Sequence, residues 1–223
     1  RHIDIVFDLA AEFSVDVDFH TDFFDEPQHL HARYIAEQTM RRGWQGRVAV
    51  GHMCEMAALP PDEQASLARR LAEAGVAVIV LPATDLYLMG RKDLRSVRRG
   101  LAPVRRLLEA GVTVAAATNN VRNAFTPFGT AGLPLMGYLL GVAGHLGGQA
   151  DLPLLLDMLT TQPARILRVT DYGLTDGCRA DLVVWDTDRA DEIITALAPC
   201  HLVTKAGRVT LEHSRSLAEP WRT

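Results

Sequence analysis

Short apolar runs rich in valine and alanine alternate with amphipathic stretches over the first half of the chain. The apolar runs are 15–20 (VDVDFH), 47–52 (RVAVGH), 76–81 (VAVIVL) and 112–118 (VTVAAAT). The amphipathic stretches that predict helices are 27–42, 62–74 and 101–110. Buried strands that alternate with helices are typical of a parallel sheet covered on both faces, so we predict an α/β fold.

Glycine marks the predicted ends of these helices. Gly43, Gly75 and Gly111 each lie where a helix stops, the position at which a left-handed backbone costs glycine least. Pro27 suits the first turn of its helix because the N–H that it lacks has no partner there. The opening RHIDIVFDLAAEF predicts a further amphipathic helix, and its apolar face is Ile3, Val6, Phe7 and Ala10.

The pattern changes after Phe128. Two helices are predicted at about 130–147 and 151–160, and short alternating strands follow at 181–187, 200–207 and 208–213. We therefore expect two parts in the chain. Residues 1–170 form βα units and the helices that follow them, and residues 171–223 form a small β appendage.

Candidate functional groups gather where the predicted strands end. Right-handed crossovers place the carboxyl ends of parallel strands at one edge of the sheet, and in a (β/α) barrel that edge carries the chemistry. The groups at this edge are His20, His52, the loop PATDLYLMGRKD at 82–93, Asn119 and Asn120. His20 and His52 are the strongest candidates because each closes a buried strand.

Composition narrows the classes of partner. The net charge of −4 provides no excess of Lys and Arg for a phosphate backbone, so we expect no nucleic acid partner. No apolar stretch approaches the roughly 20 residues that cross a bilayer, and the opening lacks the features of a signal peptide. The cysteines Cys54, Cys178 and Cys200 are widely spaced and form no CxxC pair, which favours a reducing cytoplasm.

Several segments carry a family resemblance. They are VDVDFHTDF, RVAVGHMCEM, TDLYLMGRKD, RRGLAPVRRLLEAGVTVAAATNNVRNAFTPFGT, TTQPARIL, YGLTDGCRADLVVWD and HLVTKAGRVT. In order and spacing they resemble the C-terminal two thirds of cytosine deaminase-like amidohydrolases, which are metal-dependent enzymes. The resemblance implies a (β/α)8 TIM-type barrel, of which this chain carries only the later βα units, with a C-terminal segment of a β-sandwich.

The resemblance also implies roles for particular residues. His20 matches a metal-ligand histidine, and His52 matches a histidine that lies beside the metal and the attacking water. Asn119 falls where the family has an Asp that is ligand and general base, and Asn120 falls on the acidic position that follows it. Phe23 falls on the Glu of a His-x-x-Glu motif, which places it at the substrate.

The absence of acidic side chains at these positions affects the proton transfers that hydrolysis requires. A divalent metal, zinc or iron, activates water, but a base must take the proton and an acid must return it to the leaving nitrogen. Phe23 does neither, and the amide of Asn119 does not titrate but offers its carbonyl oxygen as a neutral ligand. We therefore expect a hydrolase of non-peptide C–N bonds in small cyclic amidines or amides, with altered acid and base residues. The alternative is an inactive or truncated amidohydrolase-like protein with a binding or structural role, and isomerisation or decarboxylation also stays open.

Structural explanations compete for some of these residues. Asp25 or Glu26 would cap the next helix, Phe23 would line an apolar pocket, and the Asn-rich segment would be a loop held by side-chain turns. Arg91 is expected to anchor its loop through an ion pair.

The family's first metal motif, His-x-His on a strand end, has no counterpart in the chain. The HLH at 29–31 is predicted to lie in a helix. The expected partner is a small-molecule substrate, and a homo-oligomer or a missing N-terminal segment stays open as the source of the remaining strands.

Overall fold

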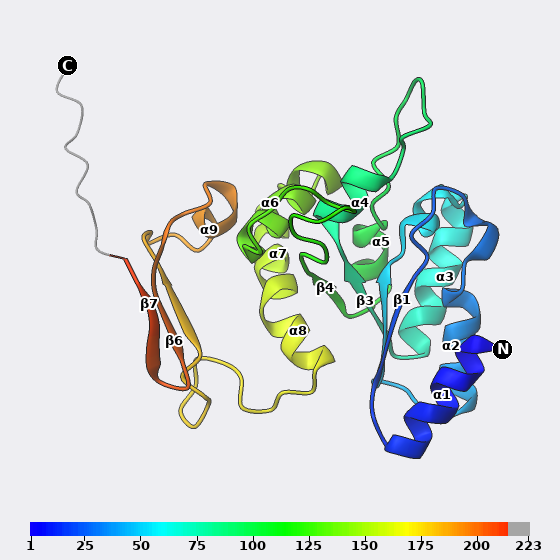
Figure 1. Cartoon of the computed structure of the whole chain (residues 1–223), viewed down its shortest axis with the longest axis horizontal. Coiled ribbons are helices and arrows are strands. Elements are labelled where there is room, and N and C mark those ends of the chain that lie inside the picture. The colour runs from blue at the N-terminus through cyan, green and yellow to red at the C-terminus, as the bar shows by residue number, and fades with distance from the viewer. Residues whose placement is uncertain (214–223) are drawn as a thin grey trace.

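The structure, a computed structural model, describes residues 1–213 except for the side chain of His29. Its main body is a four-stranded parallel sheet flanked by helices, and a separate three-stranded antiparallel sheet follows near the C-terminal end (Figure 1). The parallel strands, in spatial order, are β1 (Val17–Thr21), β2 (Val48–His52), β3 (Val76–Val80) and β4 (Val114–Ala116). The parallel pairing of all four strands confirms the predicted α/β class.

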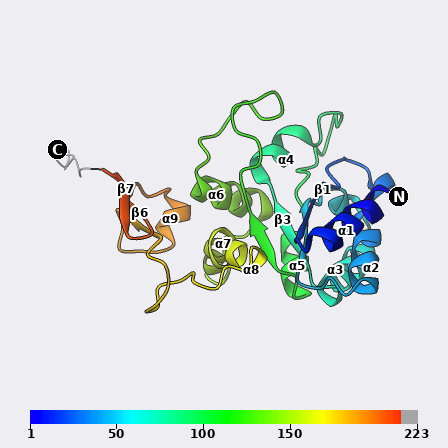
Figure 2. The ribbon, with the colours of Figure 1, turned by 60° about the horizontal axis from the view of Figure 1, so that its bottom comes forward.

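Helices precede, separate and follow these strands. They are α1 (His2–Phe13), α2 (Ala32–Arg41), α3 (Pro61–Glu73), α4 (Pro82–Leu88), α5 (Val104–Glu109), α6 (Leu133–Gly144), α7 (Asp151–Leu159), α8 (Thr161–Ile166) and α9 (Glu192–Thr195). Two 3-10 turns, Pro27–His29 and Cys54–Ala58, follow β1 and β2. Figure 2 shows α1, α2, α3 and α5 on one side of the sheet and α6, α7 and α8 beside β4.

The hydrophobic core lies between the sheet and these helices. Val17 and Phe19 of β1 are buried, and the Phe19 ring lies 5.6 Å from that of Phe7 on α1. The alternate residues Asp18 and His20 point to the opposite face and are exposed. This period of two in burial fixes which face of β1 carries the candidate histidine.

The second sheet consists of β5 (Leu182–Trp185), β6 (Cys200–Lys205) and β7 (Arg208–Glu212). It belongs to the predicted appendage, of which residues 214–223 lie outside the described part of the chain. Ile194 of α9 is 2% exposed and packs on the main body against α6 and α7. The hydrophobic core therefore includes a residue from beyond position 170. The domain boundary at residue 170 remains a prediction.

Local details differ from the sequence-based expectations. Val6 is 37% exposed, whereas Ile3, Phe7 and Ala10 are buried as predicted. The HLH at 29–31 is not helical throughout, because Leu30 is extended and α2 begins only at Ala32. Glycine at the helix ends does adopt a left-handed backbone, with φ of +66° at Gly43.

Two further observations concern covalent and membrane properties. Cys54, Cys178 and Cys200 are all free thiols. Within residues 1–213, no helix combines the length and the apolar character that a membrane crossing requires.

Candidate active site

The candidate histidines come together at the carboxyl edge of β1 and β2. The register pairs His20 with Gly51 and Thr21 with His52, so the two histidines project from adjacent strands one residue apart. A Cβ at Gly51 would lie at ordinary contact distance, 3.4 Å, from His20 Nδ1, so a side chain larger than alanine there would meet the His20 ring.

The two imidazole rings face each other through their Nε2 atoms. These nitrogens lie 2.8 Å apart, and the ring centroids are 4.3 Å apart at an interplanar angle of 70°. Partial burial lowers the pKa of His20, and the neighbouring His52 ring adds to the effect. A lowered pKa favours the neutral ring, which is the form that binds metals.

On its other side His52 contacts a buried carboxylate. Its Nδ1 lies 2.6 Å from Asp85 Oδ1, and the two side chains are 3% and 1% exposed. Asp85 Oδ2 accepts a hydrogen bond from the backbone N–H of Leu81 at 3.3 Å. Burial, followed by the charge of Asp85 and the hydrogen bond to it, raises the pKa of the Cys54 thiol. His52 is therefore held between an aspartate and a second histidine.

The same residues offer metal ligands. One ligand atom each from His52, Cys54 and Asp85 lies within 4.8 Å of the others, a grouping that could hold a metal ion. Imidazole nitrogen suits zinc and iron, and thiolate suits zinc. The available donors around the His20 and His52 pair therefore fit a divalent transition metal.

An aromatic wall stands beside the histidines. The Phe23 ring lies 5.4 Å from that of His52 and 6.5 Å from that of His20. Phe23 also stacks on Phe24, with the centroids 4.7 Å apart. Phe23 is 36% exposed, so part of its ring is open to an incoming molecule.

The asparagines follow β4 at the same edge of the sheet. Asn120 Oδ1 accepts a hydrogen bond from Asn123 Nδ2 at 2.6 Å, and Asn123 Oδ1 in turn accepts two backbone N–H groups. Asn119 Nδ2 is buried and has no hydrogen-bond partner among the described residues. Within residues 1–213 no hydrogen bond joins either Asn119 or Asn120 to the histidines. The structure therefore brings together Phe23, His20 and His52, while the asparagine loop is held by contacts of its own.

The backbone is left-handed at three of these strand ends. The φ values are 58° at Asp22, 67° at His52 and 56° at Asn119. Asp, Asn and His adopt this conformation more readily than other non-glycine residues, at a cost of about 1–3 kcal/mol each. Such strain is common at functional sites because the surrounding structure must impose it.

The β1–α2 loop that carries Phe23 is fixed from both ends. Asp22 accepts the backbone N–H of His31 at 2.8 Å and that of Ala32 at 2.9 Å, so Asp22 caps α2. The expectation that Asp25 or Glu26 caps this helix is wrong. Asp25 Oδ1 instead accepts the Gly90 N–H at 2.9 Å.

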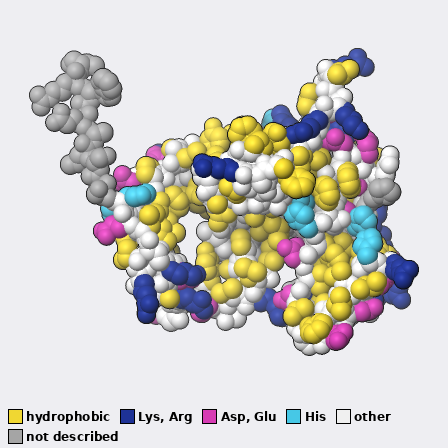
Figure 3. All heavy atoms as spheres, viewed as in Figure 1, with side chains coloured by type: hydrophobic (Ala, Val, Ile, Leu, Met, Phe, Trp, Pro, Cys, Tyr) yellow, Lys and Arg dark blue, Asp and Glu magenta, His cyan; other side chains and the backbone are white. Residues whose placement is uncertain are grey.

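The segment 89–100, between α4 and α5, projects from the body as an arm (Figure 1), and the space-filling view from the same side shows the projection (Figure 3). Arg98 ties this arm to the Phe23 loop, donating to Asp25 O at 2.6 Å and to Glu26 Oε1 at 2.9 Å. Arg91 forms no ion pair within residues 1–213. It donates to Tyr87 O at 3.0 Å and lies over the Tyr87 ring, so the ion-pair expectation for Arg91 is also wrong, and Arg98 is the anchor.

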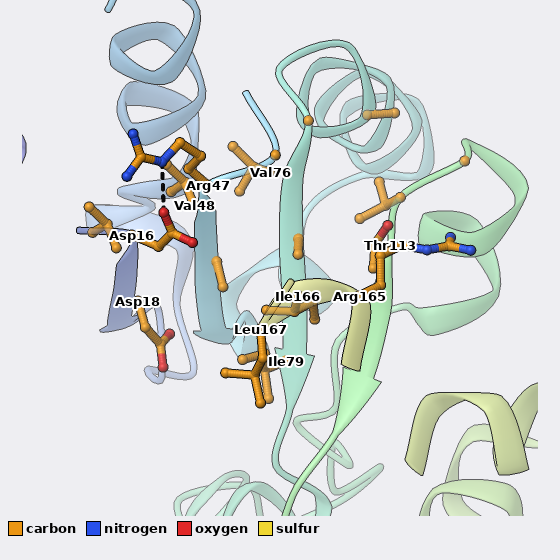
Figure 4. Close-up of a pocket in the computed structure, with 18 residues that line it drawn as sticks. Asp16, Asp18, Arg47, Val48, Val76, Ile79, Thr113, Arg165, Ile166 and Leu167 are labelled. Carbon is orange, nitrogen blue, oxygen red and sulfur yellow. Dashed lines mark hydrogen bonds and ion pairs between the residues drawn. The ribbon is translucent and has the colours of Figure 1, made fainter. Parts of the chain in front are cut away.

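A cavity of about 420 Å³ opens at the opposite, amino end of the strands (Figure 4). Ile79, Ile166 and Leu167 line it, and Asp16 pairs with Arg47 at its rim at 2.7 Å. In barrels of this kind chemistry belongs to the carboxyl edge, and the histidines lie there rather than in this cavity.

Asp85 and Cys54 are the site residues that the sequence did not single out. The loop 82–93 was expected at this edge, but nothing in its pattern distinguishes Asp85 from its other polar residues. Two features of the sequence could have pointed to them. Cys54 lies two residues after His52, and Asp85 lies four residues after the end of the apolar run 76–81.

Known proteins resemble the chain over most of its length. The model of the family described as "Amidohydrolase family" matches residues 2–211. A pterin deaminase from Rhizobium rhizogenes is 30% identical over 93% of this chain and 47% of its own length. An N-isopropylammelide isopropyl amidohydrolase from a Pseudomonas species is 27% identical over 94% of this chain and 49% of its own.

Solved structures agree with these relatives. The 5-methylcytosine deaminase from Klebsiella pneumoniae liganded with phosphonocytosine superposes with a TM-score of 0.92 and 29% identity, over 98% of this chain and 53% of that one. An N-isopropylammelide isopropylaminohydrolase from Burkholderia multivorans gives a TM-score of 0.80 and 26% identity, over 93% and 50%. The chain thus spans about half the length of the curated relatives and solved structures that it matches.

Proposed function

The chain belongs to the amidohydrolase family, and on that premise we propose that it acts as a metal-dependent hydrolase of non-peptide C–N bonds in small cyclic amidines or amides. The observation that carries the proposal is the convergence of His20 and His52 at 2.8 Å on the carboxyl edge of a parallel sheet. The relatives named for deamination and amide hydrolysis support the same class of reaction.

Each site residue has a proposed part. His20 would hold a zinc or iron ion, and the carbonyl oxygen of Asn119 is available as a neutral ligand. A metal ion bound there would lower the pKa of a water ligand to about 7. His52 lies against His20 and is placed to exchange a proton with water or with the leaving nitrogen through Nε2.

The aromatic wall would select the substrate. A planar ring fits against the exposed part of Phe23, because offset or tilted aromatic contacts are favourable. Asn120 would contact the substrate from the β4 side, through its amide group.

Metal content and turnover test the proposal together. The natural full-length protein, supplied with zinc, iron or manganese, should retain metal and hydrolyse at least one of a pterin, a cytosine, an aminotriazine and a cyclic amide. His20→Ala should lose both the metal and the turnover. His201→Ala, on β6 of the appendage, is the matched control and should keep both.

The substitutions at Phe23 and Asn119 favour a second candidate, an amidohydrolase-like protein with a binding or structural role. Neither side chain titrates, so neither replaces the family's carboxylates in proton transfer. Metal retention without turnover of any compound in the panel would favour this second candidate, whereas activity that survives His20→Ala would refute the site.

A further inference from the structure

Asp85 occupies an unusual place for a carboxylate in this chain. The positions at which the resemblance to cytosine deaminase-like proteins places acidic groups hold Phe23, Asn119 and Asn120. Yet Asp85, 1% exposed, lies 2.6 Å from His52 Nδ1. Asp85 lies on α4, away from those positions, and it bonds one of the paired histidines.

We infer that Asp85 and Cys54 are positioning residues that hold His52 as its Nδ1–H tautomer, with Nε2 directed at His20. A buried carboxylate that accepts Nδ1–H fixes both the tautomer and the plane of an imidazole. The Nε2 lone pair then faces His20 Nε2 at 2.8 Å and is the proton acceptor on that side. The consequence for turnover rests on the proposed function, but the tautomer itself does not.

A backbone donor faces one oxygen of Asp85, and the His52 ring faces the other. Leu81 contributes a backbone N–H, which can only donate, to Oδ2 at 3.3 Å. Oδ1 faces His52 Nδ1, so this nitrogen must carry the hydrogen if the contact is to be favourable. A carboxylate can accept both hydrogen bonds at once, and an amide in the same place cannot.

Cys54 completes the set of donors. Its side chain is buried, and its Sγ lies within 4.8 Å of the facing atoms of His52 and Asp85. A thiol offers an S–H donor, and a carboxylate at this distance can accept it. The thiol therefore limits rotation of the Asp85 carboxylate and through it the orientation of His52.

The same three residues could instead be ligands of a metal ion. The two roles differ in what they predict. As ligands, Cys54 and Asp85 would be needed for metal retention. If they are positioning residues, substituting them should leave the metal content largely unchanged and should change which nitrogen of His52 carries the hydrogen.

Nitrogen-detected NMR on ¹⁵N-histidine-labelled protein measures the tautomer directly, and His52→Gln assigns the signal. We expect wild-type His52 to be Nδ1–H, with a downfield proton that exchanges slowly because the group is buried. In Asp85→Asn the single amide oxygen turns to Leu81 N–H and the NH₂ faces Nδ1. The tautomer should therefore switch to Nε2–H.

Kinetics provide the second measurement. Asp85→Asn should lower kcat by about 100-fold or more while KM changes by less than about threefold, since the substrate contacts remain. Cys54→Ala should lower kcat several-fold, and Cys54→Ser, which retains a donor, should restore most of that loss. Asp151→Asn is the matched control, because Asp151 is a buried carboxylate bound to Gly148 N–H and Arg105, away from the histidines.

Three results would overturn the inference. They are an Nε2–H tautomer in the wild type, an unchanged tautomer in Asp85→Asn, and loss of bound zinc in both Asp85→Asn and Cys54→Ala. The wild-type spectrum alone tests for the Nε2–H tautomer, so this result can be obtained even if a variant fails to fold. A switched tautomer in a protein that turns over none of the tested compounds would refute the proposed function alone and leave this inference standing.

Discussion

Gly100, at the base of the arm, offers a quantitative test of the packing near the site. Its φ is +68°, and an added Cβ would lie 2.0 Å from Met89 Cβ and 2.3 Å from Met89 Cγ. Met89 Cβ is fixed to the backbone, so rotation of the side chain does not remove the overlap. Gly43 has nearly the same φ, +66°, but nothing lies within 4 Å of its added Cβ.

Comparing Gly100→Ala with Gly43→Ala separates the cost of backbone strain from the cost of the atomic overlap with Met89. Gly43→Ala should lower the free energy of unfolding by about 1–2 kcal/mol, the cost of a left-handed alanine. Gly100→Ala should add the overlap, about 1–3 kcal/mol for inserting an atom into a packed place. Its total loss should therefore be about 2–5 kcal/mol.

Urea unfolding at 25 °C, followed by tryptophan fluorescence and by far-ultraviolet circular dichroism, measures both losses. Hydrogen exchange over residues 89–100 shows whether Gly100→Ala opens only the arm. Equal losses for the two variants, with unchanged exchange in the arm, would refute the argument from Met89.

Three more predictions follow from the geometry. Phe7→Ala should lower the free energy of unfolding by about 3–5 kcal/mol in the same urea assay, because Phe7 is 1% exposed. The control Leu94→Ala, at a fully exposed position, should change it by less than about 0.5 kcal/mol. Arg98 holds the pKa of Asp93 below its ordinary 3.8. The stability that this pair gives the arm is therefore complete above pH 3.8 and is lost as the pH falls through the lower pKa of Asp93 in the folded protein. Hydrogen exchange of the arm should rise in that acidic range, and it should rise at neutral pH in Arg98→Ala. Gly51→Val should displace the His20 ring and reduce bound zinc measured by mass spectrometry, while Gly51→Ala, whose Cβ meets His20 Nδ1 at 3.4 Å, should retain it.

The meeting of His20 and His52 was predictable from the sequence, because regular structure controls it. His20 and His52 end strands whose apolar pattern is clear, and parallel pairing then places them at one edge. Asp85 was not predictable in this way, because it lies on the short helix α4 after β3, and no repeat along the chain sets the direction of its side chain toward His52. Asp22 and Arg98 were missed for a similar reason, since each bonds across loops rather than along a repeat.

The order of apolar runs, amphipathic stretches and glycines was enough to predict a parallel α/β sheet and the edge on which chemistry should lie. These features are local and periodic, so a period of two or 3.6 residues reveals them without a fold. The contact of His52 with Asp85 joins residues 33 positions apart, and that of Arg98 with the Phe23 loop joins residues 73 positions apart. No periodicity encodes such contacts, because loop backbone angles and the packing of whole helices set the side-chain directions, and the folded chain alone brings these groups together.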